Sequence, residues 1–228
     1  MARRTKAEAL ATHDNILDCA ESVFVRQGVS RTTLQHIAGA AGVTRGAIYW
    51  HFRDKADLFN AMLQRAKMPL ESAMQILARP NREDPLGDLR EYAMIVFCLM
   101  EDDPKARPVF EIATLKIEYV DEMTEVRTRR AEMTARWMAG AESKLRFARD
   151  NGRLILGVEP RDVALGLWAL MDGLLRAWMV EPQSFSLSEK GDVIVSAYLG
   201  AIRRENGRSG VTPGGPALPA VDEPALRG

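Results

Sequence analysis

Cysteine is nearly absent from this chain, with only Cys19 and Cys98 among 228 residues. Two cysteines cannot build the disulfide framework of a small secreted domain, and both lie within helical patterns, where we expect them to be buried as small apolar residues. The basic start of the chain is not followed by an apolar segment of signal-peptide length, and neither end shows a lipidation motif. These absences predict a cytoplasmic protein with reduced thiols.

Histidine is also scarce, and all three histidines lie within the first 51 residues. The rest of the chain therefore lacks imidazole groups for metal binding or proton transfer. His36 and His51 lie fifteen positions apart without an acid or a cysteine at metal-ligand spacing. The sequence has no nucleophile elbow, phosphate loop or zinc motif either. We therefore expect no enzyme, no metal site and no cofactor.

The chain carries no net charge, because 31 Lys and Arg residues balance 31 Asp and Glu residues. The total charge therefore indicates neither a nucleic-acid partner nor a membrane partner. The distribution is polarised, however: ten basic and six acidic residues occur up to residue 67, and the remainder carries the opposite excess. The amino-terminal part is thus basic and the rest is acidic.

No uninterrupted apolar run has the length of a membrane span. The most apolar segment, 163–180, is interrupted by Asp172 and Arg176, which predicts a buried helix and no membrane partner. Apolar residues recur at helical spacing nearly throughout, and we find no convincing strand. From residue 206 onward, five glycines and four prolines among 23 residues predict a disordered tail.

These patterns predict an all-α fold. The first helix carries its apolar residues between Ile16 and Phe24 and ends at Gly28, which suits a left-handed helix cap. Further helices are expected over 54–78, 86–100, 104–119, 123–151, 160–180 and 187–205. We assign residues 1–67 to a small helix-turn-helix domain, 68–205 to a larger helical domain and 206–228 to the tail.

The strongest local pattern lies within residues 31–59, which read RTTLQHIAGAAGVTRGAIYWHFRDKADLF. Thr32 or Thr33 can cap a short helix, and Thr44 can cap a second one. The small residues between the two helices allow them to cross closely, and Gly42 can adopt the positive φ angle that a tight turn requires. The segment therefore predicts a helix-turn-helix.

In a helix-turn-helix, the second helix enters the DNA major groove with its first residues nearest the base edges. Arg45 is the expected base reader, because its guanidinium can donate two hydrogen bonds to guanine, and Gly46 permits close approach. Tyr49 and His51 are expected at the edge of the groove, where they can donate to phosphate oxygens. Lys55 is expected to form an anion site with the free amides of the next helix.

Three stretches, TTLQHIA, GVTRGAIYWHF and DKADLF, are far more specific than a generic helix-turn-helix pattern. They resemble the DNA-binding signature of the TetR family, and in particular that of multidrug-efflux repressors of the AcrR and TtgR type. The resemblance is strong over residues 12–66 and looser beyond, through DPLG at 84–87 and MDGLLRAW at 171–178. It implies a homodimer with a three-helix DNA-binding domain and a larger helical domain that encloses an effector pocket.

The resemblance also implies which residues contact double-stranded operator DNA. The implied positions are Thr33, Thr44, Arg45, Gly46, Tyr49, Trp50, His51 and Lys55. For Trp50 and Phe52 a second interpretation stays open, in which their rings pack in the core of the small domain. Arg3, Arg4 and Lys6 form either an ordinary solvated end or an arm that contacts phosphates or the minor groove.

The larger helical domain is rich in methionine and aromatic residues, which form either an ordinary core or a pocket for apolar ligands. The resemblance favours a pocket for a small hydrophobic effector, lined by Leu89, Tyr92, Val96, Phe110, Thr114, Trp137, Ala141, Trp168, Met171, Asp172 and Leu175. Asp172 either pairs with Arg176 at the surface or forms a polar point in the cavity, and we favour the cavity. The bulky Phe110, Trp137 and Trp168 are expected to narrow the pocket.

The last two helices are apolar over more than one face, which a single core cannot absorb. Burial against a second subunit would account for the excess, and the resemblance places the homodimer interface on these helices. The predicted function is repression of a multidrug efflux operon and of the protein's own gene, with release from the operator by the effector. The alternative is a TetR-like sensor of a metabolite, such as an acyl-coenzyme A or an autoinducer, that controls other genes.

Overall fold

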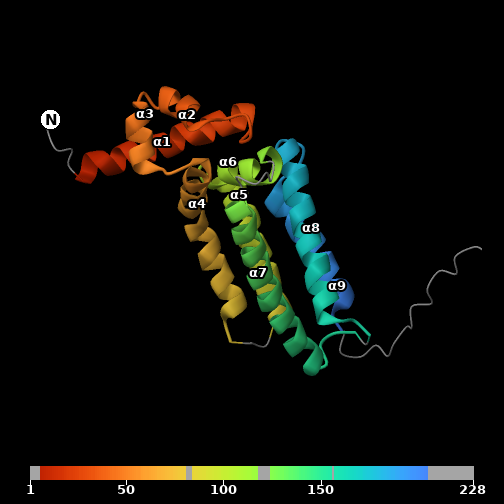
Figure 1. The fold of residues 1–228 in the computed structure, drawn as a ribbon. Coiled ribbons are helices and arrows are strands. Elements are labelled where there is room, and N and C mark those ends of the chain that lie inside the picture. The colour runs from red at the N-terminus through yellow and green to blue at the C-terminus, as the bar shows by residue number, and fades with distance from the viewer. Residues whose placement is uncertain (1–5, 81–83, 118–123, 156, 205–228) are drawn as a thin grey trace, which may run out of the picture.

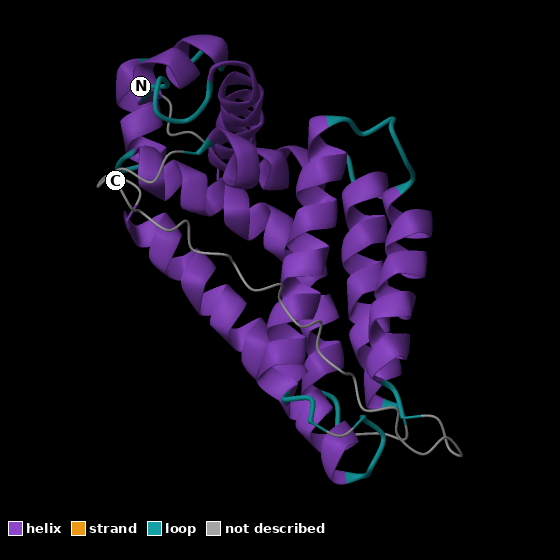
Figure 2. Ribbon diagram, turned by 90° about the vertical axis from the view of Figure 1, so that its right-hand side faces the viewer, coloured by secondary structure: helices purple, strands orange, loops and turns teal. Residues whose placement is uncertain are grey.

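The structure, a computed structural model, describes residues 6–80, 84–117, 124–155 and 157–204. These residues are helical nearly throughout, and Figure 2 shows them as helices joined by loops without a strand. In Figure 1, α1 to α3 form a small head above an elongated body. The predicted all-α fold with a small amino-terminal part and a larger helical part is confirmed. The expected arm at Arg3 and Arg4 and the expected tail over 206–228 lie outside the described residues.

The helices agree closely with the predicted ranges. They are α1 (Lys6–Gln27), α2 (Leu34–Ala40), α3 (Arg45–His51), α4 (Lys55–Ala78), α5 (Pro85–Asp102), α6 (Ala106–Glu111), the π-helical turn η1 (Ile112–Lys116), α7 (Thr124–Asp150), α8 (Pro160–Val180) and α9 (Leu187–Ile202). As predicted, α1 ends just before Gly28, which has a φ of 79°. The helix predicted over 104–119 is present but shorter and irregular, because α6 continues without a break into the π-helical η1, which ends at Lys116.

Side-chain caps set where the short helices begin. Thr33 accepts a hydrogen bond from the amide of His36, and the His36 ring accepts one from the amide of Thr33, which makes a reciprocal capping box at α2. Thr44 accepts from the amide of Ala47 at the start of α3, and Asp54 accepts from the amide of Asp57 at the start of α4. With only seven residues each, α2 and α3 are too short to be stable alone. Their stability depends on these caps and on packing within the head.

Two apolar clusters hold the molecule together, one in the head and one in the body. The head cluster is not confined to the expected domain, because it includes Val109, Ile112 and Val126 from α6, η1 and α7. In addition, α4 runs through the expected boundary at residue 67 as one helix. The head therefore rests directly on the body, and α4 belongs to both.

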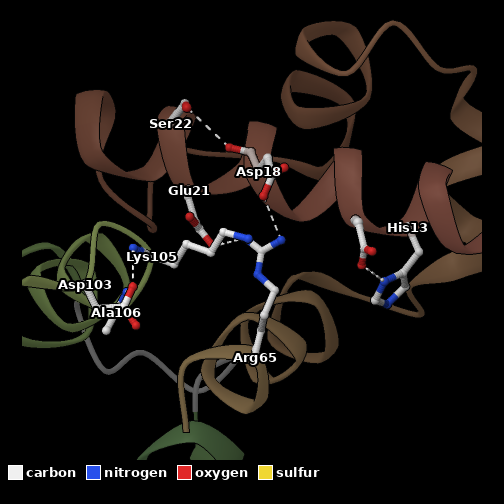
Figure 3. A network of polar contacts seen from close by, with 9 residues as sticks. His13, Asp18, Glu21, Ser22, Arg65, Asp103, Lys105 and Ala106 are labelled. Carbon is white, nitrogen blue, oxygen red and sulfur yellow. Dashed lines mark hydrogen bonds and ion pairs between the residues drawn. The ribbon is translucent and has the colours of Figure 1, made fainter. Parts of the chain in front are cut away.

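A polar network fixes α4 to α1, as Figure 3 shows. Arg65 on α4 pairs with Asp18 at 2.7 Å and with Glu21, both of which lie on α1. Burial raises the pKa of the Glu21 carboxyl, and the hydrogen bond from Arg65 offsets only part of this effect. Because the Arg65 and Glu21 side chains are largely shielded from water, this contact resists movement of α4 relative to α1 better than an exposed ion pair would.

A buried ion pair ties three helices together at the end of the body far from the head. The Lys144 side chain on α7 is 1% exposed, and its Nζ atom donates to Asp88 Oδ2 on α5 at 2.7 Å. The same ammonium donates to the backbone carbonyl of Arg79, at the end of α4, at 2.8 Å. Removal of either charge would leave the other one buried without its partner.

We expect Lys144→Met to lower the free energy of unfolding by about 3–5 kcal/mol, because the Asp88 carboxylate would lose its buried counter-charge. The double variant Lys144→Met with Asp88→Leu should lose much less, since it removes both charges. Urea unfolding at one fixed protein concentration measures both effects. Arg146→Met, at an exposed position of the same helix, is the control and should unfold at the wild-type urea concentration. Equal losses in the single and double variants would contradict the interpretation.

Candidate DNA-binding and effector-binding sites

A tight turn at Gly42 sets the position of α3 within the head. Gly42 has a φ of 65°, which an L side chain rarely adopts, and it reverses the chain between α2 and α3. The Asn15 side chain on α1 donates to the carbonyl of Ala41 at 3.0 Å and so fixes the turn to the longest helix of the head. Ile48 is fully buried and anchors one side of α3 in the head cluster. The opposite side of α3 is left open to solvent.

Most of the predicted DNA-contacting residues lie on this open surface. Six of the eight are exposed: Thr33, Thr44, Arg45, Gly46, Tyr49 and Trp50. The Arg45 guanidinium lies 5.7 Å from the centre of the Tyr49 ring, a cation–π contact that limits its freedom. A Cβ atom on Gly46 would have no neighbour within 4 Å, so glycine is not needed there for internal packing. The open space leaves room for the close approach of an outside partner.

The structure separates the two aromatic residues whose role the sequence left open. Phe52 is 2% exposed and packs in the head cluster, whereas Trp50 is 72% exposed. The core interpretation is therefore correct for Phe52 and wrong for Trp50. The Trp50 ring meets the ring of the half-buried His51 edge-on at 4.6 Å. A large exposed aromatic side chain beside Arg45 and Tyr49 extends the candidate contact surface.

At the start of α4, where the sequence predicts an anion site, the Lys55 ammonium has a partner within the protein. Lys55 is 7% exposed, and its ammonium donates to the carbonyl of Thr32 at 3.1 Å. The Asp54 carboxylate accepts from the amide of Asp57 as the cap of α4, and Asp57 accepts from the amide of Arg53 at 3.0 Å. In this structure Lys55 joins α4 to the loop before α2.

Beneath the head, a cavity of about 180 Å³ lies between α4, α5, α6, η1, α7 and α8. Nine of the eleven predicted effector residues line it: Tyr92, Val96, Phe110, Thr114, Trp137, Trp168, Met171, Asp172 and Leu175. Leu89 and Ala141 do not, because both are fully buried in the body core. Burial raises the pKa of the Tyr92 hydroxyl, which keeps this wall of the cavity uncharged.

Sequence reasoning missed eight lining residues, namely Leu63, Ala113, Val126, Arg129, Arg130, Met133, Thr134 and Met179. Five of these lie on α7 at helical spacing from Trp137, so periodicity counted back from this tryptophan could have indicated them. Leu63 was missed because it was assigned to the DNA-binding domain. Ala113 was missed because nothing in the sequence signalled the π-helical turn.

Asp172 fulfils both of the alternatives that the sequence left open. It lines the cavity, and its Oδ2 atom accepts from Arg176 Nε at 2.6 Å. Its Oδ1 atom lies 3.9 Å from Arg130 Nη2 across the cavity edge. The three charges form a polar end in an otherwise largely apolar cavity. The two arginines help to satisfy the carboxylate in a position where an unpaired charge would be costly.

An apolar surface runs along the outer side of α8 and α9. Leu165 on α8 is 57% exposed, and Val193 and Ile194 on α9 are 66% and 36% exposed. Among the described helices, only α8 is long and apolar enough to cross a membrane, and 33% of its most apolar window is buried inside the chain. Exposed apolar side chains on two adjacent helices mark a contact surface.

Titratable side chains form no further chemical site in the described ranges. Cys19 and Cys98 are free thiols and are half-buried, less than the full burial we expected. No group of three or more His, Cys, Asp or Glu side chains that could hold a metal ion occurs among these residues. The two surfaces and the cavity are therefore the features that a function must explain.

Comparison with known proteins assigns the family. Residues 16–62 match the model of bacterial regulatory proteins of the tetR family, and 84–203 match the C-terminal region of MAATS-type transcriptional repressors. The HTH-type transcriptional repressor BepR of Brucella suis is 37% identical over 88% of this chain and 96% of its own length.

Solved structures agree with this assignment. NalD, the secondary repressor of the MexAB-OprM multidrug efflux pump in Pseudomonas aeruginosa, has a TM-score of 0.79 at 31% identity, over 88% of this chain and 100% of its own. A SmeT–triclosan complex has a TM-score of 0.73 at 31% identity, over 93% and 100%. SmeT is the repressor of the Stenotrophomonas maltophilia multidrug efflux pump SmeDEF. The chain belongs to the TetR family of bacterial transcriptional regulators and is a regulator, not an enzyme.

Proposed function

We propose that this protein is a cytoplasmic homodimer that represses a multidrug efflux operon and its own gene, and that a small hydrophobic effector releases it from the operator. The observation that carries the proposal is a largely apolar cavity whose wall packs against the head that presents an exposed reading helix. NalD and SmeT, both repressors of efflux pumps, support the choice of regulated genes. The metabolite-sensor alternative has less support, since the similar fatty acid regulators are only 18% identical and share the fold alone.

The exposed side of α3 supplies the contact with DNA. Arg45 lies in the first turn of α3, where a recognition helix approaches the base edges, and its guanidinium fits guanine O6 and N7. Thr44 and Gly46 flank it without bulk. Tyr49 and Thr33 lie where they can donate to phosphates and so set the register of the head on the duplex. Lys55 supports this arrangement through its hydrogen bond to the carbonyl of Thr32.

The exposed apolar surface of α8 and α9 supplies the dimer interface. In a two-fold dimer the same surface meets itself, so Leu165 and Val193 of one protomer are covered by the same helices of the partner. The interface fixes the distance between the two heads. Two recognition helices can then read half-sites about 34–36 Å apart.

The cavity supplies the effector site. Its aromatic walls suit a flat apolar molecule, and the polar end at Asp172 can orient one hydrogen-bonding group. At about 180 Å³ the cavity is smaller than a typical pocket for a drug-sized ligand, which holds about 300–1,000 Å³. A ligand of that size needs more room, from a widening of the cavity or from the adjoining pocket of about 260 Å³, which shares Tyr92, Arg129 and Met133 with it. An effector that binds a wider form better than the DNA-bound form weakens operator binding. By linkage, DNA weakens effector binding by the same factor.

We expect Arg45→Ala to weaken binding to the DNA upstream of the protein's own gene at least about 30-fold, because the dimer loses two arginine–guanine pairs, each of which contributes about 1–3 kcal/mol of discrimination. Fluorescence anisotropy at one fixed salt concentration measures the dissociation constant. Arg161→Ala, at an exposed position of α8, removes the same charge away from α3 and should bind like the wild type. Unchanged affinity in Arg45→Ala would remove the base-reading assignment.

Val193→Glu should convert the dimer into monomers, because it would bury a carboxylate against an apolar partner surface. Light scattering coupled to size-exclusion chromatography gives the mass of the species in solution. The monomer should also lose most of its affinity for the full operator, since only one head can bind. The control is Ala135→Glu, which adds the same charge at an exposed position of α7. A dimer of unchanged stability in Val193→Glu would place the interface elsewhere.

Leu175→Trp should block effector binding while it preserves operator binding, because the larger side chain fills part of the cavity from a half-buried position. Titration with triclosan tests this, with intrinsic tryptophan fluorescence for binding and anisotropy for release from DNA. Arg161→Trp adds the same indole at an exposed site and serves as the control. A Leu175→Trp variant that triclosan still releases at wild-type concentrations would argue against this cavity as the effector site.

A further inference from the structure

The effector cavity and the DNA-reading head share a wall. Leu63, Ala113 and Val126 line the cavity, and all three also belong to the head cluster or pack against it. Ile112, the neighbour of Ala113, is fully buried in the same cluster. A change of cavity shape at this wall is therefore also a change in the packing of the head, because close-packed interiors transmit strain.

The wall contains the π-helical turn η1. Such turns are rare and are frequently found at functional sites. Here the Ala113 carbonyl accepts a hydrogen bond from the Arg130 guanidinium, and the Thr114 carbonyl accepts one from Arg176 Nη1 at 3.4 Å. Both arginines also lie against the Asp172 carboxylate, at 3.9 and 2.6 Å. The polar end of the cavity thus binds the backbone of η1 from below.

The far end of η1 contacts the head. The Lys116 carbonyl accepts a hydrogen bond from the amide of Val29 at 3.2 Å. Val29 is 1% exposed and lies in the loop between α1 and α2, directly after Gly28. A Cβ atom on Gly28 would lie 3.5 Å from the same Lys116 carbonyl. The loop that precedes the helix-turn-helix therefore rests on the last residue of η1.

We infer that η1 couples the cavity to the DNA-reading head, with Arg130 as the positioning residue. Arg130 and Arg176 hold η1, and η1 in turn holds Val29 and the start of the helix-turn-helix. An effector that widens the cavity at this wall shifts η1 and releases the head from its DNA-binding orientation. The inference rests on the proposed function and extends it by naming the route of release.

A second physical connection between cavity and head has to be distinguished from η1. Helix α4 also spans both parts, and Arg65 ties it to α1 through Asp18 and Glu21. If α4 alone carried the coupling, loss of the Arg130 contact would leave the loop at Val29 unchanged. If η1 carries it, the same loss must loosen that loop, because Arg130 binds η1 at Ala113 and Val29 binds it at Lys116.

Hydrogen–deuterium exchange on the full chain, without DNA or effector, tests this directly. Arg130→Met removes the donors but keeps much of the side-chain length, and we expect peptides over 27–33 and 112–117 to exchange about tenfold faster, as fits the loss of a hydrogen bond from a charged donor. Arg130→Lys keeps one donor and should be intermediate. Arg127→Met, at an exposed position of α7, should match the wild type. Wild-type exchange at 27–33 in Arg130→Met would overturn the inference.

Operator binding adds a functional measurement. We expect triclosan at saturation to weaken operator binding of the wild type by a larger factor than that of Arg130→Met, because η1 is already loose in the variant. An equal factor in both proteins, together with unchanged exchange at 27–33, would assign the coupling to α4. Failure of the wild type to bind its upstream DNA would refute the proposed function instead, and the exchange result would still decide whether η1 holds the head.

Discussion

The structure depends on an apolar core that the DNA-reading head cannot complete by itself. The seven-residue helices α2 and α3 lack the length to be stable alone, and their buried residues pack in a cluster that takes in Val109, Ile112 and Val126 from the body. The orientation of the reading helix is therefore set partly by residues that belong to the effector-binding part. A change in the body can therefore reach the reading helix through this shared core.

Much of the fold could be predicted from the sequence because its helices are governed by local rules. Helical periodicity predicted the long helices. The caps at Thr33, Thr44 and Asp54 set where α2, α3 and α4 begin, and the positive φ at Gly28 marks the end of α1. The boundary at residue 67 does not appear as a break in the structure, since charge composition changes there while the helical pattern of α4 does not. A change in charge composition therefore does not mark a domain boundary where one helix runs through both parts of the molecule.

The site was less predictable where the partner of a side chain depends on how distant segments of the chain pack together. Lys55 follows the pattern of a phosphate contact, but its ammonium reaches the Thr32 carbonyl, a contact between residues 23 positions apart. Trp50 and Phe52 have similar local surroundings in the sequence, and only the placement of α3 on the head exposes one and buries the other. The π-helical turn left no signal, because its geometry follows from packing and from the arginines that bind its carbonyls.

The charged groups at the polar end of the cavity lose hydration, and their position beside η1 explains why charges are found there. A carboxylate and two arginines at the edge of an apolar cavity add little to the stability of the fold, because desolvation offsets much of their attraction. Two apolar residues in the places of Arg130 and Arg176 could fill the same space, but they could not donate to the backbone carbonyls of η1. The charged group therefore fixes one arrangement of a backbone segment that lies against the head. A ligand that competes for these charges acts on that arrangement with no need to reach the DNA-binding surface itself.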